Sequence, residues 1–157
     1  MILLLTCFVI TSSSSQINST GSVPSSDTFV GSTPCDSLIK SLLQIPSTEK
    51  CEFIKWELSF LKSNPGTFQL AALYGESRPN TNGFMGGGKK LIINGKYTIS
   101  YGAGANPYAK VYHLQGDKLR ATLLLIQMDS NIFHFADAHK NFIVGNGGWG
   151  YVLNRIQ

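Results

Sequence analysis

The residues best suited to catalysis are few and scattered along the chain. Among its 157 residues are three His, three Cys and nine Asp and Glu. His113, His134 and His139 all lie in the C-terminal half, and no nucleophile motif or pair of carboxylates marks a partner for them. Spacing alone does not exclude a Ser-His-Asp set, which depends on contacts in space. We therefore expect a protein that is not an enzyme and has no catalytic residues, with a small secreted hydrolase as an alternative.

No cofactor is expected either. Three Cys and three His leave little material for a cage of several metal ligands. Gly145–Gly150 matches the spacing of a dinucleotide-binding turn, but the chain ends too soon after it for the helix and acidic residue of such a site. Gly83–Lys90 is close to a phosphate-binding loop, yet Lys90 stands where a Ser or Thr should hold Mg²⁺. We interpret these glycines as sharp bends where strands meet.

The first residues of the chain are typical of export and linker sequence. Ile2 to Ile10 are apolar apart from Thr6, and small polar residues follow, as in a secretory signal peptide. We expect a signal peptide over residues 1–15 and a flexible Ser- and Thr-rich tether over 16–28. The alternatives are lipid attachment at Cys7 and a buried first strand or helix. Export places the protein in the periplasm or at the outer membrane.

Cys35 and Cys51 remain if Cys7 leaves with the signal peptide. An even number of Cys in an oxidising compartment favours a disulfide. This bond would close a loop of about 15 residues, which in the chain-entropy model stabilises the fold by roughly 3 kcal/mol. The alternative is two unrelated thiols.

The remaining residues, 29–157, predict one ordered domain. A short helix is expected over 35–43, because Asp36 provides a start and Pro46 prevents its continuation. Strands are expected over 51–61, 67–74, 90–100, 109–114, 119–127, 131–135, 141–144 and 149–154. Asn94-Gly95 marks either a bulge or a tight turn that splits its strand.

Short strands with hairpin-sized gaps predict an all-β protein. We expect a single small antiparallel barrel of about eight strands with one short N-terminal helix. The alternation of Ile54, Trp56, Leu58 and Phe60 with polar neighbours indicates which side chains point into it. The interior of so small a barrel holds either side chains or one small ligand.

The charge of the chain is modest and dispersed. The net charge is +4, and the 13 Lys and Arg contain no run longer than the pair Lys89-Lys90. A nucleic-acid-binding protein usually gathers its basic residues on one face or helix. We therefore expect no nucleic-acid partner, and contact with a membrane only through a lipid anchor.

Several short motifs occur in a characteristic order. Gly31-Ser32-Thr33-Pro34-Cys35 precedes the expected helix, and Gly95–Ile99, Tyr112-His113-Leu114 and Gly116–Leu119 follow later. This order resembles the N-terminal barrel domain of the NlpE-type copper-resistance and envelope-stress lipoproteins. The resemblance implies a lipocalin-like barrel with a role in surface sensing and copper tolerance. Leu38 replaces the second Cys of the family's Cys-x-x-Cys, and a single thiolate holds Cu(I) poorly, so no metal site is expected.

These observations predict a non-enzymatic, exported envelope protein. Its barrel would bind a small ligand or another envelope protein, with envelope stress sensing as the implied context. An open mouth lined by Trp56, Tyr74 and Trp149 would hold a small ligand, whereas a barrel filled with side chains would favour recognition of a partner. Copper handling is the alternative, and it would place a His or Met beside Cys35.

Overall fold

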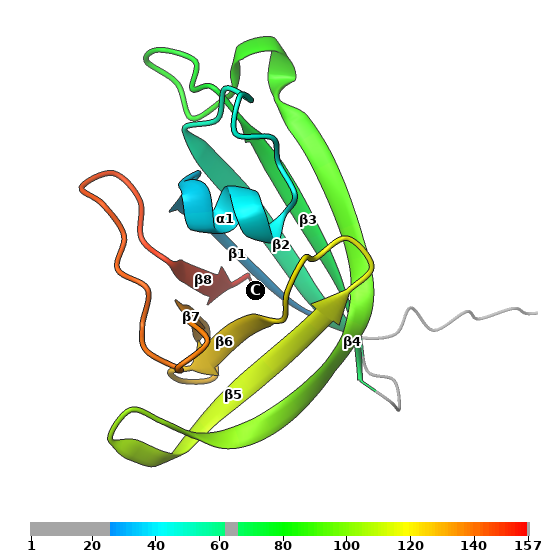
Figure 1. Ribbon diagram of the computed structural model, residues 1–157, viewed down its shortest axis with the longest axis vertical. Helices are drawn as coiled ribbons and strands as arrows, with labels where there is room; N and C mark the ends of the chain where they lie inside the picture. Colours follow the sequence, from blue (N-terminus) through cyan, green and yellow to red (C-terminus); the bar gives the residue numbers. More distant parts are fainter. Residues whose placement is uncertain (1–25, 62–65, 157) are drawn as a thin grey trace, which may run out of the picture.

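The computed structural model describes residues 26–61 and 66–156, in which eight antiparallel strands close into one barrel (Figure 1). The strands follow one another around the barrel in chain order, and β8 pairs with β1. The strands are β1 Ser26–Pro34, β2 Phe53–Leu61, β3 Thr67–Gly75, β4 Lys89–Ala103, β5 Asn106–Gly116, β6 Leu123–Gln127, β7 Ile132–Ala136 and β8 Val152–Arg155. The helix α1 spans Ser37–Leu42, and the 3-10 turn η1 spans Met85–Gly87. The predicted antiparallel barrel with one short helix is confirmed.

The barrel begins earlier than the sequence predicts. β1 starts at Ser26, so residues 26–28 belong to the barrel and not to the tether. Phe29 and Val30 are its only large apolar residues, and no alternation marks it as a strand. The segment forms a strand because it pairs with β2 along its whole length. The predicted signal peptide, Cys7 and the rest of the tether lie outside the described residues.

β4 is one continuous strand. Asn94-Gly95 neither splits it nor forms a bulge, and a register shift occurs instead between Tyr101 and Ala103. At Gly95 the strand changes partner, since it pairs with β3 along its first half and with β5 along its second. A Cβ on Gly95 would collide with the carbonyl oxygen of Gln115. The backbones therefore approach too closely there for a larger residue.

The predicted strand at 141–144 is wrong. Phe142 forms only an isolated bridge with the end of β7. The Asp137 carboxylate accepts the backbone N–H groups of His139 at 2.8 Å and Asn141 at 2.9 Å, which closes a turn directly after β7. Hydrogen bonds to the Asp137 carboxylate lower its pKa. The bond from the Asn141 backbone N–H has the largest effect, and bonds from the Asn141 side chain and the His139 backbone add to it. The chain then continues as a loop to β8.

Side chains fill the interior of the barrel. Ile54, Trp56, Leu58 and Phe60 are at most 7% exposed and belong to one core, as their alternation predicts. Other large members of that core are Phe68, Phe133, Phe135 and Tyr151. The interior is therefore a packed core of the kind found in small barrels.

Five aromatic side chains pack against one another at one end of the barrel, which we call the aromatic end: Phe29, Phe60, Tyr97, Tyr112 and Phe133. The ring centroids are 4.7 Å apart in the pair Phe29–Phe133 and 4.9 Å apart in Phe60–Tyr97 and in Tyr112–Phe133. Burial raises the pKa of the Tyr112 hydroxyl. These contacts close that end of the core.

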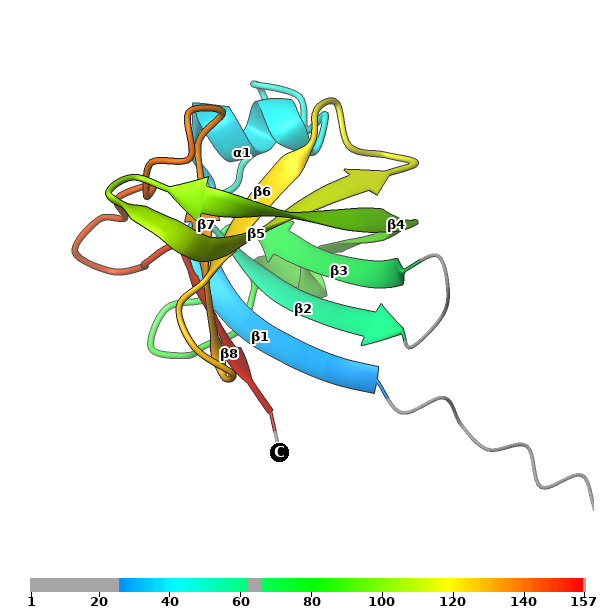
Figure 2. The same cartoon turned by 90° about the horizontal axis from the view of Figure 1, so that it is seen from below.

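The helix α1 closes the opposite end, which we call the α1 end. It lies on the concave side of the long strands in Figure 1 and next to β6 in Figure 2, and it borders the ends of β6 and β7. One carboxylate oxygen of Asp36 caps the helix by accepting the N–H of Ile39 at 3.0 Å, and the other accepts the hydroxyl of Tyr151. The predicted disulfide is confirmed: Cys35 and Cys51, with Cα atoms 5.7 Å apart, join the start of α1 to the chain before β2.

The first and last described strands meet beside the aromatic end. The backbone N–H of Ile156 donates to the carbonyl of Thr28 at 3.0 Å, and Arg155 forms an ion pair with Asp27. Within the described part of the chain, neither helix has the length and hydropathy to cross a bilayer.

Candidate functional site

The three residues predicted to line a barrel mouth lie in different surroundings. Trp56 is 2% exposed, and its indole N–H donates to the hydroxyl of Thr33 at 2.9 Å. Tyr74, near the end of β3, is partly buried against the same core. Trp149 lies outside the core, where its ring stacks on Phe53 with centroids 5.0 Å apart. The structure does not bring these three side chains together. Because side chains fill the interior, a small ligand has no room inside the barrel, and recognition of a partner, or of a ligand at a site outside the core, is favoured.

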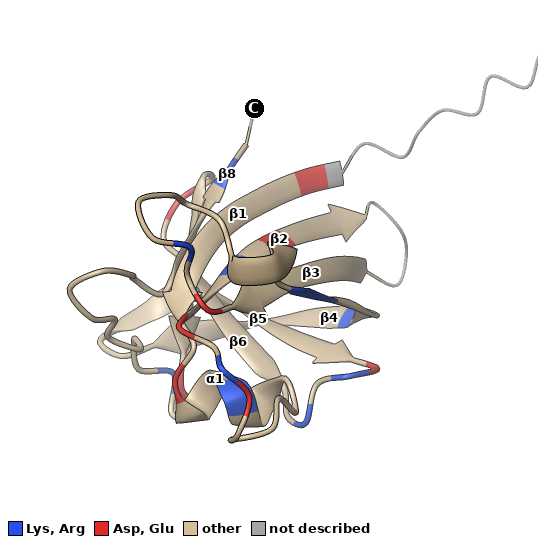
Figure 3. Cartoon of the chain, turned by 90° about the horizontal axis from the view of Figure 1, so that it is seen from above, with Lys and Arg blue, Asp and Glu red and all other residues tan. Residues whose placement is uncertain are grey.

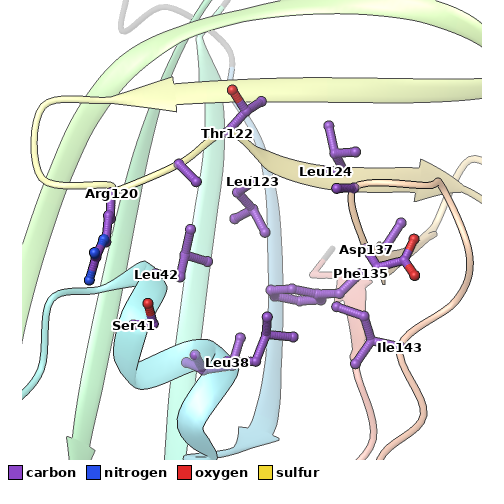
Figure 4. Close-up of a pocket in the computed structure, with 14 residues that line it drawn as sticks. Leu38, Ser41, Leu42, Arg120, Thr122, Leu123, Leu124, Phe135, Asp137 and Ile143 are labelled. Carbon is purple, nitrogen blue, oxygen red and sulfur yellow. The ribbon is translucent and has the colours of Figure 1, made fainter. Parts of the chain in front are cut away.

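A pocket of about 370 Å³ lies between α1 and the ends of β6 and β7 (Figure 4). Its wall is mostly apolar: Leu38 and Leu42 of α1 face Leu123, Phe135 and Ile143 across the space (Figure 4). The helix is only six residues long and leaves Leu38 49% exposed. We call this space the apolar pocket. Its size and lining suit a small ligand with a hydrocarbon part.

A second pocket, of about 380 Å³, adjoins the first, and we call it the polar pocket. Its lining includes the hydroxyl groups of Ser37 and Ser47 and the ammonium group of Lys40. Ser41 and Arg120 line both pockets. A single ligand placed past these two residues can therefore contact apolar side chains at one end and polar side chains at the other.

The junction of the two pockets is positively charged. In residues 26–61 and 66–156, the Arg120 guanidinium has neither a hydrogen-bond nor an ion-pair partner. The Lys40 ammonium donates to two neutral carbonyls, of Glu49 at 2.8 Å and of Ser47 at 3.4 Å. Asp137 lies on the far side of the apolar pocket from Arg120 (Figure 4). An anionic group is therefore favoured at the Arg120 side.

Basic and acidic residues elsewhere are mixed. Figure 3 shows that residues of both signs alternate along the loops around α1. The charge at the pocket junction is therefore a local feature of Lys40 and Arg120 rather than part of a broad basic face.

Backbone and side-chain hydrogen bonds fix the loop that carries Arg120. Its backbone N–H donates to the carbonyl of Leu42 at 2.9 Å, and the Gln44 amide donates to the carbonyl of Lys118 at 3.2 Å. These bonds attach the loop between β5 and β6 to the C-terminal end of α1. At the other end of the helix, burial and then the hydrogen bond to Asp36 raise the pKa of Tyr151.

The His and Cys residues have other partners. His113 Nε2 is hydrogen-bonded to the Ser100 hydroxyl at 2.7 Å, and His134 Nδ1 to the carbonyl of Phe135 at 2.8 Å. Within the described ranges, neither ring is bonded to a carboxylate, the third member of a triad. The same residues contain no group of three or more His, Cys, Asp or Glu placed to hold a metal ion. The Cys35 sulfur is bonded to Cys51.

Sequence reasoning does not single out Ser41 or Arg120. Leu38 and Leu42 lie in the helix that the sequence predicts over 35–43, but the sequence does not mark them as residues of a binding site. The three large apolar side chains of SLIKSL lie on one helix face, as expected for a helix that packs on a core, so they give no separate signal of a pocket. The position of Arg120 depends on the return of the chain to α1, which no local pattern encodes.

No protein-family model, curated protein or solved structure matches this chain. The geometry and chemistry of the two pockets are therefore the basis for assigning a function.

Proposed function

We propose that this protein is a non-enzymatic, exported binding protein whose ligand is a small anionic amphiphile, such as a medium-chain fatty acid. The hydrocarbon tail lies in the apolar pocket, and the acidic head lies between Arg120 and Ser41. One observation carries this proposal: Arg120, a cation without a partner among the described residues, lines the apolar pocket itself and, with Ser41, the adjoining polar pocket.

The charge and the lining select this ligand class over others. A wholly apolar ligand would make no use of the Arg120 guanidinium, which is exposed at the edge of the apolar pocket. A cationic amphiphile would meet two like charges, those of Arg120 and Lys40. A carboxylate can accept two hydrogen bonds from a guanidinium in a bidentate arrangement.

The disulfide supports the proposed export. Bonds such as Cys35–Cys51 persist in oxidising compartments. A location in the periplasm or at the outer membrane, a role in envelope stress sensing and a relation to the NlpE-type lipoproteins stay predictions. Copper handling gains no support from Cys35, whose sulfur is part of the disulfide.

The proposal is tested by calorimetric titration with saturated fatty acids of increasing length. Each buried methylene contributes about 0.8 kcal/mol, so the affinity should rise up to about fourfold per methylene and level off once the pocket is full. Decanol and decylamine, which share the tail of decanoate, should bind more weakly. Equal binding of decylamine, or no binding of any of these acids, would contradict the proposal.

A matched pair of variants locates the head group. Arg120→Gln should weaken decanoate binding about tenfold, as expected for the loss of a charge-assisted hydrogen bond, and should leave decanol binding unchanged. Lys118→Gln removes the same charge two positions away, outside both pockets, and should have little effect. If both variants weaken binding equally, the general surface charge and not Arg120 is responsible.

A further inference from the structure

Three aromatic rings stack on the barrel apart from the two pockets. Phe53, the first residue of β2, contacts Phe84 with centroids 4.3 Å apart and Trp149 with centroids 5.0 Å apart. The Trp149 indole is within 8° of parallel to the Phe53 ring. Phe53 and Phe84 are buried, whereas Trp149 is half-buried. The stack therefore holds a partly exposed indole in a fixed plane.

A third pocket, of about 290 Å³, borders Trp149, and we call it the Trp149 pocket. Most of its other lining is polar: Arg78, Asn80 and Asn82 come from the loop between β3 and β4, and Lys55 comes from β2. The residues that line it include two cations and no carboxylate. The Lys55 ammonium lies 5.8 Å from the Phe84 ring centroid, beside the same stack.

Internal hydrogen bonds define the shape of the loop and leave its long polar side chains available. The Arg78 N–H donates to the Gly83 carbonyl at 3.0 Å, and the Thr81 hydroxyl donates to the Arg78 carbonyl at 3.0 Å. Within the part of the chain that the structure describes, the side chains of Arg78, Asn80 and Asn82 have no hydrogen-bond partner. The pocket thus offers two amides and a guanidinium beside an aromatic plane.

We propose that the Trp149 pocket binds an acidic saccharide, such as an oligomer of a uronic acid. The C–H face of a pyranose packs on the indole, and its hydroxyls exchange hydrogen bonds with Asn80 and Asn82, whose amides both donate and accept. The carboxylate pairs with Arg78 or Lys55. A simple inorganic anion would not use the indole, and an apolar ligand would not use the amides or the two cations.

This site is independent of the proposed amphiphile site. The Trp149 pocket shares no lining residue with the apolar or the polar pocket. Arg120→Gln should therefore leave saccharide binding unchanged, and Trp149→Ala should leave decanoate binding unchanged. Failure of one proposal is thereby distinguished from failure of the other.

The experiment is calorimetric titration of the full chain with trigalacturonate and with its trimethyl ester, which has the same rings without charge. We expect trigalacturonate to bind at about millimolar concentration or below and the ester to bind several-fold more weakly. Inorganic phosphate and acetate are the controls for a simple anion site. No heat from trigalacturonate, or equally tight binding of acetate, would overturn the proposal.

Variants of the pocket supply the second test. Trp149→Ala should weaken trigalacturonate binding about tenfold, whereas Trp149→Phe should keep most of the affinity, since it retains an aromatic face. Arg78→Gln should reduce the preference for the acid over the ester. If Trp149→Ala does not fold, Asn82→Ala and Trp149→Phe provide the measurement. Unchanged affinity in Asn82→Ala and Trp149→Ala, or an unchanged preference in Arg78→Gln, refutes the assignment.

Discussion

The two ends of the barrel are closed by different means. At the aromatic end, rings from five strands pack against one another, and Phe29 and Phe133 are at most 4% exposed. At the α1 end, a helix of six residues covers the core and is held by the Asp36–Tyr151 hydrogen bond and the disulfide. Side chains that interdigitate leave few voids, whereas a short helix lies across an opening that it does not fill.

This difference explains the position of the amphiphile site. The apolar and polar pockets both lie along α1, where the closing element is smaller than the opening. We infer that the aromatic end mainly supplies stability and that the α1 end combines closure with binding. The predictions below test that division, beginning with the largest effect.

The aromatic end should be the more sensitive to a cavity. Phe133→Ala removes a ring that is 1% exposed and contacts Phe29, Phe60 and Tyr112. We expect the free energy of unfolding to fall by about 3–5 kcal/mol, measured by urea denaturation. Phe142→Ala is the matched control, because Phe142 is 50% exposed, and its effect should be far smaller. Similar losses in both variants would contradict the division.

Removal of the disulfide should weaken the α1 end. The double variant Cys35→Ser, Cys51→Ser should lose about 3 kcal/mol of unfolding free energy, since the bond closes a loop with a sequence separation of 16. A reducing agent should lower the stability of the natural chain by the same amount and leave the double variant unaffected. In the double variant, amide hydrogen exchange should become faster in α1 than it is in the natural chain, with a smaller change at the aromatic end. Equal acceleration at both ends would show that the disulfide does not act locally.

Tyr151→Phe should produce a smaller, pH-dependent loss. The Tyr151 hydroxyl donates to Asp36, and its loss should lower the free energy of unfolding by about 1–2 kcal/mol at neutral pH. Because folding raises the pKa of Tyr151 above the value of about 10 in the unfolded chain, its contribution is complete below that pH and falls as the pH rises further.

Denaturation between pH 8 and pH 11 measures this linkage, a range that spans the ordinary pKa of about 10 for tyrosine. Tyr151→Phe should decline less steeply above pH 10 than the natural chain does. Tyr112→Phe is the comparison at the aromatic end, where burial also raises the pKa of the hydroxyl. Parallel curves for the natural chain and Tyr151→Phe would show that this hydroxyl does not contribute to the alkaline loss.

The smallest expected change in stability is at Leu38. This side chain is 49% exposed and lines the apolar pocket. Leu38→Gln keeps a good helix former and should change the free energy of unfolding by less than about 1 kcal/mol. The affinity for decanoate should nevertheless fall several-fold. A large loss of stability, or unchanged affinity, would show that Leu38 serves the core rather than the ligand.

The sequence predicts the parts of the barrel that alternate clearly. Ile54 to Phe60 face the core at every second position, so β2 is predictable from one segment. β1 is not, because its strand structure comes from pairing with β2 and not from its own pattern. The role of Asn94-Gly95 cannot be read from the sequence for a similar reason. Gly95 is required because its backbone lies close to the backbone of Gln115, a residue distant in the sequence.

The candidate sites depend even more on distant segments. Trp149 is recognisable in the sequence as an aromatic candidate, but its neighbours Phe53 and Phe84 come from separate parts of the chain. Arg120 reaches α1 only because its loop is hydrogen-bonded to Leu42. Residue types therefore suggest binding, whereas tertiary contacts decide which residues share a pocket.

The contact between the first and last described strands has a practical consequence for experiments. It joins Asp27 to Arg155 and Thr28 to Ile156. A short linker between these segments would give a circular permutant, with new ends opened in an exposed loop. On a biosensor chip, a tag attached after Ile156 would hold the molecule by the aromatic end. The helix and its two pockets would then face the flowing solution, unobstructed by the support.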